Sequence, residues 1–250
     1  MHTRLFFTMM MIALALPNSG FTEEQKWGTL KGQALFDGEI PKLQPLIAGA
    51  GGIQVEDESL IVDPKTKGIA NVVVYLQKRP RAVHPDLEKT FKVDEQAEKP
   101  DEITFRIKDG RFVPHVMLIS TTKQIRLINE DSKAGVVHSN PIRNHPFNLL
   151  LSPNDEKGRV IGPLIQAEKI PVWVTNDIHP WMRGYWFVLD HPYAVITDKE
   201  GKYEILNLPV GEHHFCVWQE RKGILIKDYP VQIHEGLNEQ KPLELGADRR

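Results

Sequence analysis

Short runs of alternating or β-branched residues, each ended by a turn sequence, are the feature that most limits what this chain can fold into. Ile103–Ile107 and Gln124–Asn129 alternate apolar and polar side chains, with the period of two that places one face of a strand in a core. Val72–Leu76 is rich in β-branched residues, which suits a buried strand. The best helical candidate, Pro85–Ala97, is charged and bounded by prolines, so we interpret it as a connector. We therefore predict an all-β chain built from β-sandwiches.

Turn sequences separate the strands predicted in the last quarter of the chain. Thr197–Gly201 is a turn between Val195–Ile196 and Tyr203–Ile205. Asn207–Gly211 is a second turn and leads into His213–Trp218. Asp, Asn, Gly and Pro are favoured in such turns because they adopt or cap the backbone conformations that tight turns need. Further strands are predicted over Thr29–Phe36, Val172–Thr175 and Tyr185–Leu189.

The first 20 residues have the pattern of a secretory signal peptide. Arg4 contributes to a cationic start, Leu5–Leu16 is an apolar run, and Pro17–Gly20 interrupts that run. At about 12 residues the run is too short to span a bilayer as a helix. We therefore predict a cleaved signal peptide over residues 1–20, a periplasmic or extracellular location, and no membrane span in the mature chain. A short membrane anchor and a buried helix are the alternatives.

Composition and missing motifs narrow the classes of function. A net charge of −2 at pH 7 provides no basic field for nucleic acid. The single cysteine, Cys216, cannot form an intrachain disulfide, and within Phe215–Trp218 its thiol is expected to be buried and inert. The chain contains no Gly-x-Ser-x-Gly elbow, His-Glu-x-x-His helix or phosphate-binding loop, so we predict that it is not an enzyme. His115, beside Pro114, is expected to have a structural hydrogen-bonding role.

Several segments in the middle of the chain carry a resemblance to a known family. They are Phe112–His115, Ile128–Asp131 and Asn176–Met182, the last of which reads Asn-Asp-Ile-His-Pro-Trp-Met. Asp190–Asp198 follows as Asp-His-Pro-Tyr-Ala-Val-Ile-Thr-Asp. Together they resemble a group of exported planctomycete-type bacterial proteins of the cupredoxin-like kind, labelled methylamine-utilisation or plastocyanin-like. The resemblance implies a cupredoxin-like domain over residues 100–190.

A second resemblance lies on either side of this region. Thr197–Tyr203 reads Thr-Asp-x-x-Gly-x-Tyr, and Leu208–Gly211 reads Leu-Pro-x-Gly. Earlier in the chain, two glycine-containing strand patterns match the same family, at Gly28–Phe36 and Gly68–Leu76. These patterns are similar to the carboxypeptidase regulatory-like, or prealbumin-like, β-sandwich. The resemblance implies that residues 27–80 and 191–235 form one discontinuous domain into which the cupredoxin-like β-sandwich is inserted.

The cupredoxin resemblance also implies a type 1 copper site of two histidines, one cysteine and one methionine. His179 and Met182 stand at two of the four positions, but Asn176 stands where the cysteine is expected and Gly135 where the other histidine is expected. His138 is the nearest substitute. On an extended strand, however, residues 135 and 138 point to opposite faces. We therefore predict no physiological copper cofactor. A weak copper site formed by His138, His179 and Met182 is the alternative.

The function predicted from these features is that of an exported, non-catalytic binding or structural module. Its partner would be a carbohydrate or another exported protein. Trp181, Tyr185, Trp186 and Tyr193 lie close to the Asn176–Met182 segment in the sequence, and aromatic rings can stack on sugars or pack in a core. A copper protein for electron transfer or copper handling, with a rearranged site, is the alternative function.

Overall fold

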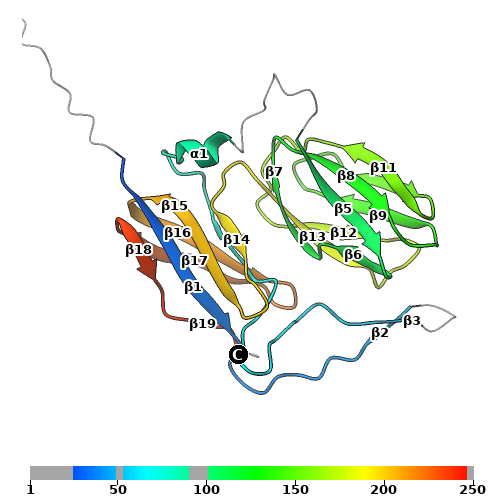
Figure 1. Cartoon of the computed structure of the whole chain (residues 1–250), viewed down its shortest axis with the longest axis horizontal. Coiled ribbons are helices and arrows are strands. Elements are labelled where there is room, and N and C mark those ends of the chain that lie inside the picture. The colour runs from blue at the N-terminus through cyan, green and yellow to red at the C-terminus, as the bar shows by residue number, and fades with distance from the viewer. Residues whose placement is uncertain (1–24, 49–52, 90–100, 247–250) are drawn as a thin grey trace, which may run out of the picture.

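The computed structural model describes residues 25–48, 53–89 and 101–246 (Figure 1). The predicted signal peptide over residues 1–20 lies outside these ranges, as does most of the connector predicted over Pro85–Ala97. The start of that connector forms one short helix, α1 (Pro85–Glu88). The remaining regular elements are strands, so the all-β prediction is confirmed. Over the described ranges, no helix is long and apolar enough to cross a membrane.

The strands fall into two groups along the chain. The outer group comprises β1 (Trp27–Leu35), β2 (Leu46–Ala48), β3 (Ile53–Val55), β4 (Val73–Leu76), β14 (Ala194–Ile196), β15 (Lys202–Pro209), β16 (Gly211–Gln219), β17 (Gly223–Ile233), β18 (Gly236–Glu239) and β19 (Leu243–Glu244). The central group comprises β5 (Glu102–Lys108), β6 (Arg111–Val113), β7 (Val116–Ser120), β8 (Gln124–Asn129), β9 (Gly135–Asn140), β10 (Phe147–Leu151), β11 (Asp155–Ile161), β12 (Val172–Thr175) and β13 (Arg183–Leu189).

Two sheets of the outer group enclose one core, and we call this unit the flanking sandwich. One sheet has the order β15-β1-β18, with β19 also paired to β1, and the other has the order β14-β4-β16-β17. Leu30 and Ile205 from the first sheet meet Val74 and Val217 from the second. All four are buried because they occupy the inward positions of strands whose side chains alternate between two faces.

Two sheets of the central group enclose a separate core, and we call this unit the central sandwich. Their strand orders are β10-β9-β12-β13-β7 and β11-β8-β5-β6. Phe105 and Leu127 from the smaller sheet meet Val137 and Trp186 from the larger one. The rings of Phe105 and Trp186 pack edge to face with centroids 5.0 Å apart.

The two sandwiches meet through a third apolar cluster, which we call the junction. Its members come from β4 and β16 on one side and β7 and β13 on the other: Val73, Tyr75, Cys216, Trp218, Val116, Phe187 and Leu189. The Trp218 ring lies 4.8 Å from the Tyr185 ring and 5.1 Å from the Phe187 ring, measured between centroids. The Cys216 thiol is free and buried, as predicted, and this burial raises its pKa.

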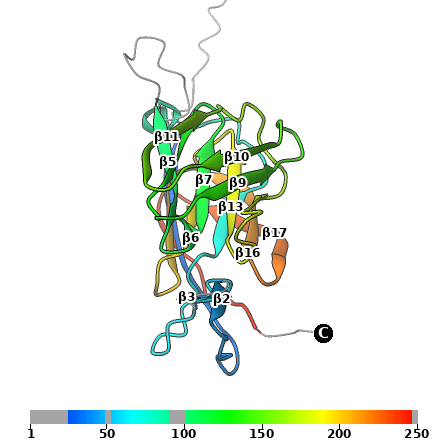
Figure 2. The same ribbon diagram turned by 90° about the vertical axis from the view of Figure 1, so that its right-hand side faces the viewer.

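An arm leaves the flanking sandwich after β1 and carries the β2–β3 hairpin. Figures 1 and 2 both show it reaching beneath the central sandwich before it returns to β4. Val55 is buried there, and a Cβ placed on Gly110 would lie 3.2 Å from its Cγ2 atom. The arm therefore packs against the turn between β5 and β6.

Trp218→Ala tests how much the junction stabilises the chain. Removing this buried ring should lower the free energy of unfolding by about 3–5 kcal/mol, because lost apolar contacts and a cavity both contribute. Trp173→Ala is the matched control, since that ring is 47% exposed, and it should cost about 1 kcal/mol or less. Chemical denaturation of both variants gives the comparison. Equal losses would contradict a stabilising junction.

Candidate functional site

The segment Asn176–Met182 forms a loop between β12 and β13, at the end of the central sandwich that faces the arm. Asn176 is buried at the start of the loop. Its Oδ1 atom accepts hydrogen bonds from the backbone N–H groups of Ile178 and His179, both at 3.0 Å. Its Nδ2 atom donates to the sulfur of Met182 at 3.1 Å. One amide side chain thus fixes both the start and the end of the loop.

The imidazole ring of His179 makes two contacts that hold it in place. Its Nε2 atom donates to the carbonyl oxygen of Ala134 at 3.2 Å. Its ring lies 4.9 Å from the Trp181 ring, measured between centroids. The backbone N–H of Met182 also donates to the His179 carbonyl at 2.9 Å. His179 and Met182, two of the three tentative metal ligands, therefore lie in one hydrogen-bonded loop.

Gly135 and His138 lie on opposite faces of β9. A Cβ on Gly135 would lie 2.4 Å from the Cδ1 atom of Ile107 in the core and 3.2 Å from the Nδ2 atom of Asn176. A histidine at position 135 therefore requires Ile107 to move. His138 points to the outer face, where its Nδ1 atom donates to the Asp177 carboxylate at 3.0 Å. His138 is therefore bonded to Asp177 on the outer face, whereas His179 bonds to Ala134 and Met182 to Asn176.

The Asp177 carboxylate accepts hydrogen bonds from two side chains. Besides His138, the side-chain amide of Asn148 donates to it at 2.6 Å. These hydrogen bonds, the one from His138 first, lower the pKa of the Asp177 carboxyl. Asp177 therefore links β9, β10 and the loop on the outer face of the sheet.

The cupredoxin resemblance implies copper ligands at positions 135, 176, 179 and 182, which here are Gly, Asn, His and Met. The position at which it implies a thiolate holds a neutral amide whose donor is directed at the Met182 sulfur. The position of the second imidazole is Gly135, which has no side chain. Among the residues that the structure describes, no group of three or more His, Cys, Asp or Glu side chains is arranged to hold a metal ion.

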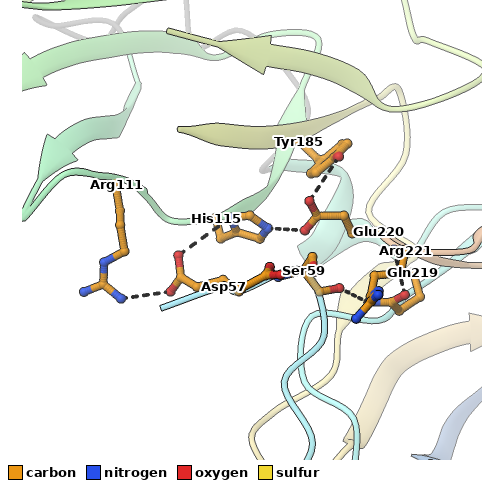
Figure 3. Close-up of polar contacts among 9 residues, drawn as sticks. Asp57, Ser59, Arg111, His115, Tyr185, Gln219, Glu220 and Arg221 are labelled. Atoms are coloured by element: carbon orange, nitrogen blue, oxygen red, sulfur yellow. Dashed lines mark hydrogen bonds and ion pairs between the residues drawn. The ribbon is translucent and has the colours of Figure 1, made fainter. Parts of the chain in front are cut away.

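A partly buried polar chain links the arm to both sandwiches, and we call it the polar bridge (Figure 3). His115 donates from Nε2 to Glu220 at 2.5 Å, and the Tyr185 hydroxyl donates to the same carboxylate at 3.2 Å. On its other side, the Nδ1 atom of His115 lies 3.8 Å from Glu58, which accepts from Arg111 at 3.1 Å. The side chains of His115 and Glu220 are 11% and 10% exposed. His115 thus has the hydrogen-bonding role expected of it.

A cleft runs between the arm and the loops of the central sandwich. Its inner part, of about 170 Å³, lies against the polar bridge, and its outer part, of about 720 Å³, opens past Trp181 and His179. The two parts share six lining residues: Val55, Glu56, Gly110, Arg111, Trp181 and Met182. The Trp181 indole N–H donates to the Gly110 carbonyl at 3.1 Å, which fixes its ring in the wall.

The structure separates the four aromatic residues near the loop. Trp186 and Tyr193 are fully buried in the two cores, and Tyr185 packs on Trp218 at the junction. Of the four, Trp181 lines the cleft. Sequence reasoning missed Trp173, which is 47% exposed and has the Arg183 guanidinium 5.8 Å from its ring centroid. The alternation in β12 could have indicated this exposure. Val172 and Val174 face the core, so Trp173 between them faces outward.

Comparisons with known proteins add little to this geometry. No protein-family model matches the chain, and no curated protein matches it. Among solved structures, it is similar to the Cu-containing nitrite reductase (NirK) from Thermus scotoductus SA-01, with 19% identity and a TM-score of 0.33 over 43% of this chain and 27% of that chain. It is also similar to amicyanin from Paracoccus versutus, with 14% identity and a TM-score of 0.28 over 39% of this chain and 96% of that chain. These neighbours are cupredoxins, but identities and TM-scores this low do not place the chain in their family.

Asn176→Ala tests the role of the amide in the loop. The substitution should lower the free energy of unfolding by about 1–3 kcal/mol, because two backbone N–H groups lose their acceptor. Asn148→Ala removes an amide that bonds to Asp177 at an exposed position and should change stability by about 0.5 kcal/mol or less. Denaturant titration of both variants measures the difference. A neutral Asn176→Ala would show that the loop does not depend on the amide.

Proposed function

We propose that this protein is an exported, non-catalytic β-sandwich module that binds a carbohydrate or another exported protein, and that its cupredoxin-like copper site is degenerate. The observation that carries the proposal is the Asn176 side chain. Its oxygen and its nitrogen are both engaged inside the loop, so the position of a copper thiolate is held by a neutral amide. A type 1 site depends on that thiolate as its soft, covalent ligand.

In this proposal the two sandwiches are two domains. The central sandwich is a cupredoxin-like domain over residues 100–190. It is inserted into a carboxypeptidase regulatory-like domain formed by residues 27–80 and 191–235. Separate cores support the division, since Tyr193 and Tyr203 belong to the core of the flanking sandwich and Trp186 to that of the central sandwich.

We place the ligand in the cleft between the arm and the loops. The cleft is within the size range of protein binding sites for small molecules. Trp181 offers an aromatic surface, while the side chains of Gln54, Glu56, Ser132 and Lys133 line the same space. These four polar side chains make no hydrogen bond or ion pair to another described residue, so their donors and acceptors remain open to a ligand. An aromatic surface with mixed donors and acceptors suits a polyhydroxyl ligand such as a sugar.

Copper titration tests the degenerate site. After copper loading and desalting, the wild-type chain should retain no stoichiometric copper and should show no copper–thiolate absorption, because the thiolate and the second imidazole are missing. His179→Ala is the matched variant and should behave in the same way. Elemental analysis and visible absorption are the measurements.

A single copper ion that is retained by the wild type and lost in His179→Ala would overturn this part of the proposal. That result would support the alternative function, a copper-handling or electron-transfer protein that uses His179 and Met182. The His138 ligand can be tested separately, because His138→Ala should remove one hydrogen bond to Asp177, leave the one from Asn148 in place, and not affect a site formed by the loop alone.

A glycan-array screen tests the carbohydrate ligand. Binding should be lost in Trp181→Ala, because the ring that lines the cleft is removed, and retained in Trp173→Ala, whose exposed ring lies on the outer sheet face. Thermal unfolding of both variants checks that they are folded. If no glycan binds the wild type, another exported protein is left as the proposed partner.

A further inference from the structure

Two loops lie together at the end of the central sandwich opposite the Asn176–Met182 loop. They are residues 141–146, between β9 and β10, and residues 162–171, before β12, and we call them the loop pair. Within the described chain, Ile142 and Ile165 are the two most exposed large hydrophobic side chains, at 72% and 73%. From this tip we infer a new interaction surface. We propose that the loop pair docks onto an anionic lipid surface, with these isoleucines inserted at the headgroup boundary.

Hydrogen bonds between the two loops hold the segments that carry the exposed isoleucines. Glu168 is buried, and its carboxylate accepts from the backbone N–H groups of Arg143 at 2.8 Å and Asn144 at 3.0 Å. The Asn144 side chain donates to the Gln166 carbonyl at 2.8 Å and accepts from the Gln166 backbone N–H at 3.1 Å. The two loops are therefore fastened to each other. Such a preformed tip has little conformational entropy to lose when it binds.

The charge of the loop pair favours an anionic surface. Residues 141–146 and 162–171 include two cations, Arg143 and Lys169, and one carboxylate, Glu168, so with His145 counted as neutral their formal charge is +1 (2 − 1). Glu168 is buried, which leaves the two cations on the surface of the loop pair. Trp173 and Arg183 extend the surface along the outer sheet face, since Trp173 pairs with Asn140 directly before the loop. The tip thus has a small positive charge on a chain whose net charge is −2. Exposed apolar side chains accompanied by cations are the combination that binds the interface of anionic membranes.

A lipid surface fits the tip better than a protein partner does. Ile142, Ile165 and Ile170 are aliphatic, and none of them lines the cleft or the polar bridge. Trp173 and the arginines would also suit a protein interface, but the most exposed apolar groups here are aliphatic side chains on loops, which the headgroup region of a membrane accommodates without a fitted pocket. The inference is independent of the ligand proposed for the cleft, which lies at the other end of the same sandwich.

Site-specific fluorescence tests the proposal on the full chain. Cys216 is buried, so a cysteine introduced by Ile142→Cys or Ile165→Cys is the accessible thiol for an environment-sensitive dye. Vesicles of equal parts phosphatidylglycerol and phosphatidylcholine should shift the emission of both labels to the blue. A label at Ile178→Cys is the matched control, because Ile178 is 50% exposed at the opposite end, and it should not respond.

Vesicle flotation gives the second readout. Ile142→Ser with Ile165→Ser should weaken binding at least about tenfold, because two apolar side chains no longer enter the interface. Ile178→Ser with Leu237→Ser removes two exposed apolar side chains elsewhere and should leave binding unchanged. Pure phosphatidylcholine vesicles should bind more weakly than the anionic ones.

Three results would overturn the proposal. One is an unshifted label at positions 142 and 165 in the presence of anionic vesicles. Another is equal flotation of the wild type and the Ile142→Ser, Ile165→Ser variant, which would place any membrane contact elsewhere in the chain. The third is equal flotation with pure phosphatidylcholine and with anionic vesicles, which would show that the surface does not recognise anionic lipid.

Discussion

Burial of β13 on both faces is the constraint on which the rest of this structure depends. Trp186 and Val188 point into the core of the central sandwich, while Phe187 and Leu189 point into the junction. A strand that is apolar on both faces must be covered on both, so the β4–β16 side of the flanking sandwich packs against it. That packing brings Glu220 to His115 and Tyr185 in the polar bridge. The same packing holds the flanking sandwich, from which the arm extends, against the central sandwich. The position of the arm, and with it the cleft between the arm and the loops, therefore depends on the junction.

Within the central sandwich, one amide decides what the Asn176–Met182 loop can do. Asn176 bonds to two backbone N–H groups and to the Met182 sulfur, so the loop closes through its own side chains. A thiolate at that position would offer a metal ligand but no N–H donor to the sulfur. The same residue therefore supports the loop conformation and, in our proposal, removes the copper chemistry from it.

Much of the local structure could be predicted from the sequence, because strand periodicity and turn residues act over a few positions. The period of two correctly separated Gly135 and His138 onto opposite faces of β9. A hydrogen-bonding role could be predicted for His115, but its partner in the polar bridge could not, since Glu220 is 105 positions away and lies in no motif. The exposed Ile142 and Ile165 were missed because exposure depends on how the loops fold back. The division into two family domains remains a prediction.

The central claim of our proposal is that an amide stands where the copper thiolate is expected in this loop. Crystals soaked with copper and measured at the copper absorption edge test it most directly. Our account predicts no anomalous peak at the loop and an unchanged contact of 3.1 Å between Asn176 Nδ2 and the Met182 sulfur. An anomalous peak bonded to a His179 nitrogen and the Met182 sulfur, at about 2.0–2.3 Å, would contradict it.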